Sequence, residues 1–129
     1  MIVLDTHVWV WWVDGNKRLS FHQLEVITAN ETDVIGVSAI SCWEIAMLVK
    51  RGELGFSIGL KDWFAQALNY PGVRLIELTP EIAIESTQLP DEFHRDPADR
   101  IIVATARINN CPLAISDNKI LNYPHVQTI

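Results

Sequence analysis

Four carboxylates in this sequence occur where they could share one site. Asp5 and Asp117 each follow directly after a short apolar run, and Glu44 and Asp99 lie near the starts of two segments with helical periodicity. Carboxylate oxygens suit hard cations such as Mg²⁺ and Mn²⁺, which keep part of their water shell and bind substrate phosphates. The four acids are therefore candidates for a metal centre that activates water and stabilises charge on a phosphate.

Alternating strands and helices are expected to bring these acids together. Apolar runs that read as strands buried on both faces cover 2–4, 34–38, 73–78 and 113–116. Helical spacing of apolar residues covers 20–28, 39–50, 60–69, 81–88 and 98–109. Such alternation is typical of a parallel sheet with helices on both faces, whose sites form beyond the carboxyl ends of the strands. We therefore expect one α/β domain over residues 1–129, a three-layer α/β/α sandwich around a central parallel sheet.

Local signals mark several helix ends. Ser20 has Gln23 in the capping-box position, and Thr79 and Asp96 each precede a proline that suits the first helical position. Gly52 follows two cations and is expected to end its helix. These signals fix where the helices carrying Glu44 and Asp99 begin or end.

Each acid also has a structural interpretation. Asp99 could be a capping-box acid, Ser41 and Glu44 could form another capping box, and Asp117 could open a turn. Asp5 differs, because the three residues after it suggest no turn or cap, and an acid beside a buried strand is costly. The four acids together are thus stronger evidence for a functional site than any one of them alone.

The composition narrows the function classes. With 129 residues, 49% of them apolar, the chain can build a sizeable core. Ten Lys and Arg against 16 Asp and Glu give a net charge of −6, which argues against a general phosphate-binding surface but not against metal-mediated contact with nucleic acid. Neither a membrane-spanning run nor a signal peptide is apparent, so we expect a cytoplasmic protein with no membrane contact. Cys42 and Cys111 read as small buried hydrophobes.

Four motifs, in order, resemble the PIN-domain family, in particular its VapC-type ribonuclease toxins of toxin–antitoxin pairs. They are 2–7 (IVLDTH), 38–45 (SAISCWEI), 96–106 (DPADRIIVATA) and 113–121 (LAISDNKIL). The resemblance covers essentially the whole chain. It implies a PIN-like fold and a metal-dependent endoribonuclease that hydrolyses RNA phosphodiesters.

The resemblance also implies roles for individual residues. Asp5, Glu44, Asp99 and Asp117 take the places of the family's acidic quartet and would hold one or two Mg²⁺ or Mn²⁺ ions. Glu44 would orient the attacking water or hold the metal, and the segment before Asp117 departs from the pattern of many relatives. Supporting roles fall to Thr6, Asp96, Ser116 and Arg100. Of these, Arg100 could guide RNA phosphates or pair with a neighbouring acid.

Partners follow from the same resemblance: an RNA substrate, a cognate antitoxin protein and a second copy of the chain in a homodimer. Trp9, Trp11 and Trp12 crowd one short helix, so at least one indole is expected at the surface or at a contact. His7 is expected to be a packing residue with one hydrogen bond rather than a ligand.

Three other classes remain as alternatives. A phosphatase of the haloacid-dehalogenase type needs a second Asp where this chain has His7. An acidic Mg²⁺-binding phosphotransfer or signalling domain needs paired acids after the first strand and an Asp after the third, where Leu78-Thr79 stand. A catalytically inactive PIN-like interaction module would not need its acids, yet all four are present.

Overall fold

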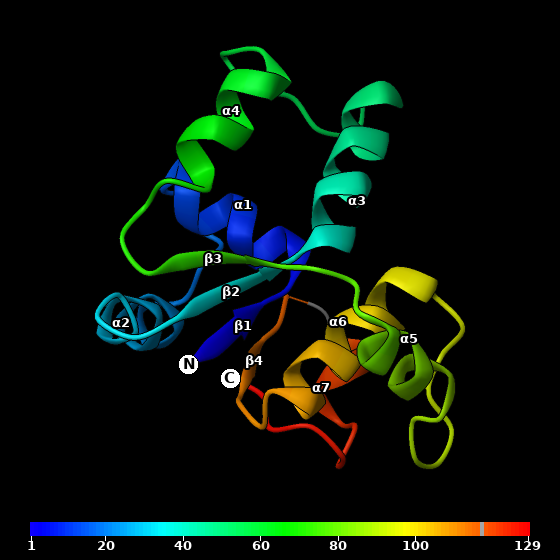
Figure 1. Cartoon of the computed structure of the whole chain (residues 1–129). Coiled ribbons are helices and arrows are strands. Elements are labelled where there is room, and N and C mark those ends of the chain that lie inside the picture. The colour runs from blue at the N-terminus through cyan, green and yellow to red at the C-terminus, as the bar shows by residue number, and fades with distance from the viewer. Residues whose placement is uncertain (117) are drawn as a thin grey trace.

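A four-stranded parallel sheet forms the centre of the computed structural model, which describes residues 1–116 and 118–129 (Figure 1). The strand order is β3-β2-β1-β4, with every neighbouring pair parallel. The strands are β1 (Ile2–Leu4), β2 (Ile35–Ser38), β3 (Val73–Ile76) and β4 (Leu113–Ala114). The predicted α/β architecture with a central parallel sheet is confirmed.

Helices cover both faces of this sheet. The helices are α1 (Thr6–Asp14), α2 (Phe21–Ala29), α3 (Ala39–Lys50), α4 (Leu60–Ala67), α5 (Pro80–Thr87), α6 (Pro97–Ile108) and α7 (Asn118–Leu121). Buried residues of α1 to α4 form one apolar core with the sheet, and those of α5 to α7 form a second. The two sets of helices form the outer layers of the sandwich, with α1, α3 and α4 above the sheet and α5 to α7 below it in Figure 1. None of these helices in the described part of the chain is long and apolar enough to cross a membrane.

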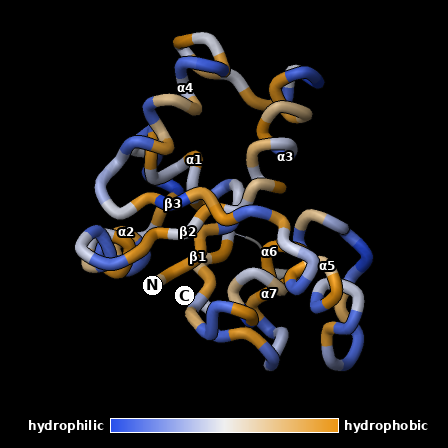
Figure 2. The backbone as a smooth tube through the Cα atoms, in the orientation of Figure 1, coloured by the Kyte–Doolittle hydropathy of each residue, from blue (hydrophilic) through white to orange (hydrophobic). Residues whose placement is uncertain are grey.

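The strands β1, β2 and β4 are buried along their whole length, whereas the edge strand β3, predicted to be buried on both faces, exposes Arg74 and Leu75. In β1, Ile2 and Leu4 belong to the core on the α1 side, whereas Val3 belongs to the core on the α6 side. All three side chains are fully buried. The strands accordingly form a hydrophobic stretch through the middle of the molecule in Figure 2. A buried strand of this kind fixes the position of the residue that directly follows it.

The chain changes direction in the sheet after β3. From β1 it moves outward to β2 and then β3, and it returns through α5 and α6 to place β4 on the other side of β1. The crevice at the carboxyl ends of β1 and β4 is therefore the topological switch point, where parallel sheets of this kind bind ligands.

Most predicted element ends are confirmed, and the differences shorten elements. The capping box of Ser20 and Gln23 is present, and the Thr79 and Asp96 side chains accept from backbone N–H groups of their helices. Gly52 has φ +73°, a left-handed conformation that ends the helix as expected. The helix predicted over 60–69 ends at Ala67, and the strands predicted over 34–38, 73–78 and 113–116 are Ile35–Ser38, Val73–Ile76 and Leu113–Ala114. The strands are shorter than predicted because the apolar runs in the sequence extend beyond the residues that pair with a neighbouring strand.

The tryptophans of α1 are less exposed than the sequence suggests. Trp9 is fully buried and packs edge-on against Trp63, with ring centroids 5.4 Å apart. Trp11 and Trp12 are half-buried against the same core. The exposed indole is Trp43 on α3, with 57% of its surface accessible.

Candidate functional site

Asp5 lies at the switch point, where β1 ends and α1 begins without an intervening loop. Its backbone N–H donates to Ala114 O at 2.9 Å, which extends the pairing of β1 with β4. Oδ1 of its side chain accepts from Val8 N at 2.9 Å. Oδ2 accepts from both the backbone N–H and the hydroxyl of Ser116, at 2.6 and 2.9 Å. These three hydrogen bonds hold the carboxylate between the ends of two neighbouring strands.

The bond to Val8 corrects one sequence prediction. Asp5 was expected to have no cap partner, but it is the N-cap of α1. Because only 5% of Asp5 is exposed, burial raises the pKa of its carboxyl above the ordinary value of 3.8, against the opposing effect of its hydrogen bonds. The charged form is thus costly in this position unless a cation approaches it.

A hydroxyl pair links α1 to Glu44 on α3. The hydroxyls of Thr6 and Ser41 are hydrogen-bonded at 2.9 Å, and Thr6 Oγ1 also donates to Oε1 of Glu44. Thr6 and Ser41 are both buried. Since a threonine hydroxyl has only one proton and a carboxylate is the stronger acceptor, Ser41 supplies the proton between the two hydroxyls. The pair therefore fixes one oxygen of Glu44.

Glu44 has no capping role, contrary to one interpretation of the sequence. The N-cap of α3 is Ser38, whose hydroxyl accepts from Ile40 N at 3.2 Å. Ser41 is thus inside the helix, and its hydroxyl is turned toward α1. Sequence reasoning missed this role of Ser41, because the partner is 35 residues away.

The third acidic contribution comes from the beginning of α6. Asp96 caps this helix by accepting from Asp99 N at 3.2 Å, as expected. The side chain of Asp99 is half-buried, and its Oδ2 lies 3.2 Å from Nε2 of His94. His94 belongs to the loop before α6, so this loop contributes to the surroundings of Asp99.

These groups border one small cavity of about 160 Å³. Its lining residues are Asp5, Thr6, His7, Glu44, Asp96, Asp99 and Ser116. Three of the four predicted acids therefore share a cavity, although they come from three distant segments. Asp117, the fourth, lies outside the described residues.

The donor set fits a hard divalent cation. All the acids and hydroxyls of the cavity offer oxygen, the ligand type that Mg²⁺ and Mn²⁺ prefer. Within 1–116 and 118–129, no three Asp, Glu, His or Cys side chains converge as a ready-made metal site. Mg²⁺ commonly binds through one or two carboxylates and keeps several waters, so a cavity lined by dispersed acids remains compatible with it.

Two other predicted residues are placed differently from expectation. His7 is exposed at the edge of the cavity, with its ring centroid 6.2 Å from that of Trp11, rather than buried as a packing residue. Arg100 is not among the residues lining the cavity, and within 1–116 and 118–129 it forms no ion pair with an acid; its guanidinium donates to backbone carbonyls instead. Thr6 and Ser116 do contact the predicted acids, as described above.

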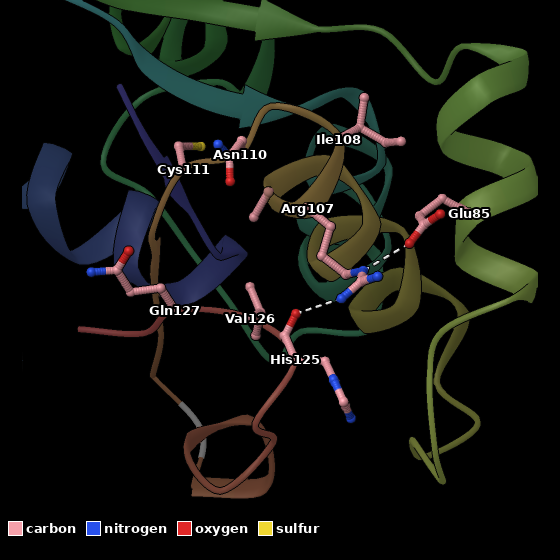
Figure 3. A pocket seen from close by; sticks show the side chains of 9 residues that line it. Glu85, Arg107, Ile108, Asn110, Cys111, His125, Val126 and Gln127 are labelled. Carbon is pink, nitrogen blue, oxygen red and sulfur yellow. Dashed lines mark hydrogen bonds and ion pairs between the residues drawn. The ribbon is translucent and has the colours of Figure 1, made fainter.

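A second cavity, of about 450 Å³, lies where α6 ends and the chain leads into β4 (Figure 3). Arg107 crosses it, donating through Nε to Glu85 at 2.7 Å and through Nη1 to His125 O at 2.6 Å. Cys111, just before β4, also lines it. This cavity contains none of the predicted acids and is separate from the site at Asp5.

Comparison with known proteins gives a consistent picture. The family model of the PIN domain matches residues 2–126. A curated relative, Ribonuclease VapC22 of Mycobacterium tuberculosis, is 32% identical over 128 residues, which cover 99% of this chain and 95% of that protein.

Solved structures share the fold at low sequence identity. The crystal structure of DNA-bound VapBC from Salmonella typhimurium matches with a TM-score of 0.72 at 15% identity, covering 99% of this chain and 96% of that one. VapBC2 from Rickettsia felis, bound to a promoter DNA fragment, gives 0.70 at 17% identity, covering 100% and 98%. FitAcB from Neisseria gonorrhoeae gives 0.70 at 19% identity, covering 100% and 96%.

Proposed function

This chain belongs to the PIN-domain family, and from that premise we propose that it is a divalent-metal-dependent endoribonuclease, the toxin of a toxin–antitoxin pair. The observation that carries the proposal is the cavity at the switch point, which Asp5, Glu44 and Asp99 border from three distant segments. The 32% identical relative, of which the match covers 95%, is named a ribonuclease. This name supports the same reaction class for the present chain.

In this proposal, Asp5 and Asp99 hold the cation, with Glu44 and Asp117 completing its surroundings. When bound, the cation supplies an activated water and stabilises the charge that develops on the phosphate. The chain itself contributes orientation. Val8 N and the two Ser116 donors hold Asp5, so its carboxylate cannot rotate freely.

Glu44 is the proposed acceptor of the water proton. Thr6 donates to its Oε1, and no residue in the described part of the chain donates to Oε2, which is therefore the proposed acceptor for a water molecule. Because the Thr6–Ser41 pair is buried, the position of this carboxylate is set before substrate arrives.

The proposed partners are RNA, an antitoxin protein and a second copy of the chain. An antitoxin is supported by the fold's similarity to the toxin–antitoxin complexes VapBC and FitAcB. A homodimer is supported by the exposed Trp43 on α3, since aromatic side chains are enriched at interfaces. A cytoplasmic location, where RNA is available, remains a prediction.

The proposal is tested with purified chain freed of any co-purifying partner. It should cleave a mixed RNA pool in Mg²⁺ or Mn²⁺ and stop in EDTA, and activity should return when the metal is restored. Asp99→Asn serves as the matched inactive control for a contaminating nuclease. Equal cleavage by wild type and control, or cleavage unaffected by EDTA, would refute the proposed mechanism.

A further inference from the structure

Arg100 joins three backbone carbonyls on the segment that leads into the candidate site. Its Nε donates to Ser86 O at 2.9 Å, and its Nη1 is within hydrogen-bonding distance of Phe93 O at 3.2 Å and His94 O at 3.4 Å. Ser86 lies near the end of α5, whereas Phe93 and His94 belong to the loop before α6. One half-buried side chain thus fastens this loop to two helices.

The fastened loop has direct contact with the site. His94, whose carbonyl accepts from Arg100, places its Nε2 3.2 Å from Oδ2 of Asp99. Asp96, two residues further on, lines the same cavity. The loop also contains Asp91 in a left-handed conformation, with φ +56°, so its path depends on tertiary contacts such as these.

We propose that Arg100 is a positioning residue for the ribonuclease site: its guanidinium fixes the backbone of His94 and thereby the surroundings of Asp99. The expected effect of Arg100 on RNA cleavage rests on the proposed function. Its effect on the position of His94 does not. It differs from the role in guiding phosphates expected from the sequence, because the guanidinium is bonded to carbonyls rather than lining the cavity.

Replacing Arg100 with lysine distinguishes a role in positioning the loop from a role in guiding phosphates. A planar guanidinium donates in several fixed directions, which is how Arg100 reaches Ser86 O and Phe93 O together. An ammonium has the same charge but is a single point on a flexible stem. Arg100→Lys therefore preserves attraction for phosphate and removes the bridge between α5 and the loop.

Arg107 provides a matched control on the same helix. It is also half-buried, and it also donates through Nε and Nη1 to two different elements, α5 and the C-terminal segment (Figure 3). Its contacts border the cavity between the end of α6 and the start of β4. Arg107→Lys should therefore remove a comparable bridge while leaving the three bonds of Arg100 in place. It reaches the loop indirectly, through His125, whose Nε2 lies 2.6 Å from Oδ2 of Asp91.

The experiment compares the full chain with both lysine variants. We measure melting temperature, kcat and KM for a fixed RNA in Mn²⁺, and the histidine ring signals in NMR spectra of the metal-free protein. Arg100→Lys should lower kcat about 10- to 100-fold, the usual cost of losing a group that orients a site, with KM little changed. The His94 ring signals should shift in this variant alone, and Arg107→Lys should keep wild-type kcat.

Other results would overturn the inference. One is an Arg100→Lys variant that keeps the wild-type kcat and shows unshifted His94 signals. The other is an equal loss of kcat in Arg100→Lys and Arg107→Lys. If wild type itself does not cleave RNA, the proposed function fails, and the His94 signals still decide the role of Arg100. If Arg100→Lys does not fold, hydrogen exchange of the Arg100 Nε–H in wild type decides instead. Slow exchange supports the bond to Ser86 O, and exchange at the rate of a solvent-exposed arginine overturns it.

Discussion

Replacing Asp5 with Asn should separate the cost of the buried charge from its function. Asn is as good an N-cap as Asp, so the bond from Val8 N can be kept. The amide group then faces Ser116, where the wild-type carboxylate accepts from a backbone N–H at 2.6 Å. One donor now points at another donor, while the Ser116 hydroxyl can rotate to accept.

The two effects on the apo protein oppose each other. Leaving a buried N–H without an acceptor costs about 1–3 kcal/mol. Removing the charge relieves the desolvation that raises the pKa of Asp5, which stabilises the apo protein at neutral pH. We therefore expect apo Asp5→Asn to lose less free energy of unfolding than the unsatisfied N–H alone would cost, so less than about 3 kcal/mol.

The sign of the pH dependence follows from the raised pKa. The folded state binds the Asp5 proton more tightly than the unfolded state, so the neutral carboxyl contributes stability that is fully present below the ordinary pKa of 3.8. This contribution is lost as pH rises from that value through the folded pKa. The unfolding free energy of wild type minus that of Asp5→Asn should accordingly fall as pH is raised over this interval.

The decisive measurement is thermal unfolding in a Mn²⁺ titration. A cation that binds only the folded state adds about 2.7 kcal/mol at 100 times its dissociation constant. For a domain of this size, that corresponds to a rise of roughly ten degrees in melting temperature. Wild type should show this rise, and Asp5→Asn should lose most of it. Asp62→Asn, an exposed acid on α4, should respond as wild type does.

One outcome would refute this reasoning. It is an apo Asp5→Asn protein that is destabilised by several kcal/mol and still shows the full Mn²⁺ response. Asp5 would then be a structural cap only, and the proposed metal site would lose its central ligand.

Three further predictions concern single positions. Asp96→Asn should keep the cap of α6 and most RNA cleavage, whereas Asp99→Asn should abolish cleavage without unfolding the protein; the reverse pattern in cleavage assays would show that the acids are misassigned. Thr6→Val removes the donor to Glu44, so kcat should fall about 10- to 100-fold with circular dichroism unchanged, and wild-type kcat would exclude the proposed orientation of Glu44. Gly72→Ala places a Cβ 2.7 Å from the backbone oxygen of Glu31 at a residue with φ +82°, and it should cost about 1–3 kcal/mol in denaturant unfolding, against little change for Gly55→Ala, which meets nothing within 4 Å.

Much of the fold could be predicted because its signals are local. Apolar strands of three or four residues and the caps at Ser20, Thr79 and Asp96 depend on neighbours in sequence. Parallel strands then place Asp5 at the carboxyl edge of the sheet by topology alone. The shared cavity of Asp5 and Asp99 was thus accessible from the pattern of elements.

The contacts that orient these acids could not be predicted in the same way. Thr6 and Ser41 meet across 35 residues, and Ser116 reaches Asp5 across 111. Arg100 was expected to guide RNA phosphates or to pair with a neighbouring acid, because nothing local indicates that carbonyls of another helix and a loop will face it. Such roles depend on how two layers pack, which the spacing of residues does not specify.

The N-cap role of Asp5 has a consequence for how fold and function are combined. Because α1 starts directly after β1, the same carboxylate satisfies the first turn of a helix and borders the cavity. A cap needs only one carboxylate oxygen, and Asn would provide it without a buried charge. Ser116 donates twice to the other oxygen, yet burial still outweighs all these bonds in its effect on the pKa of Asp5. A structural role alone therefore does not account for an acid here, whereas a cation held between Asp5 and the acids of α3 and α6 would offset the cost that the fold leaves uncompensated.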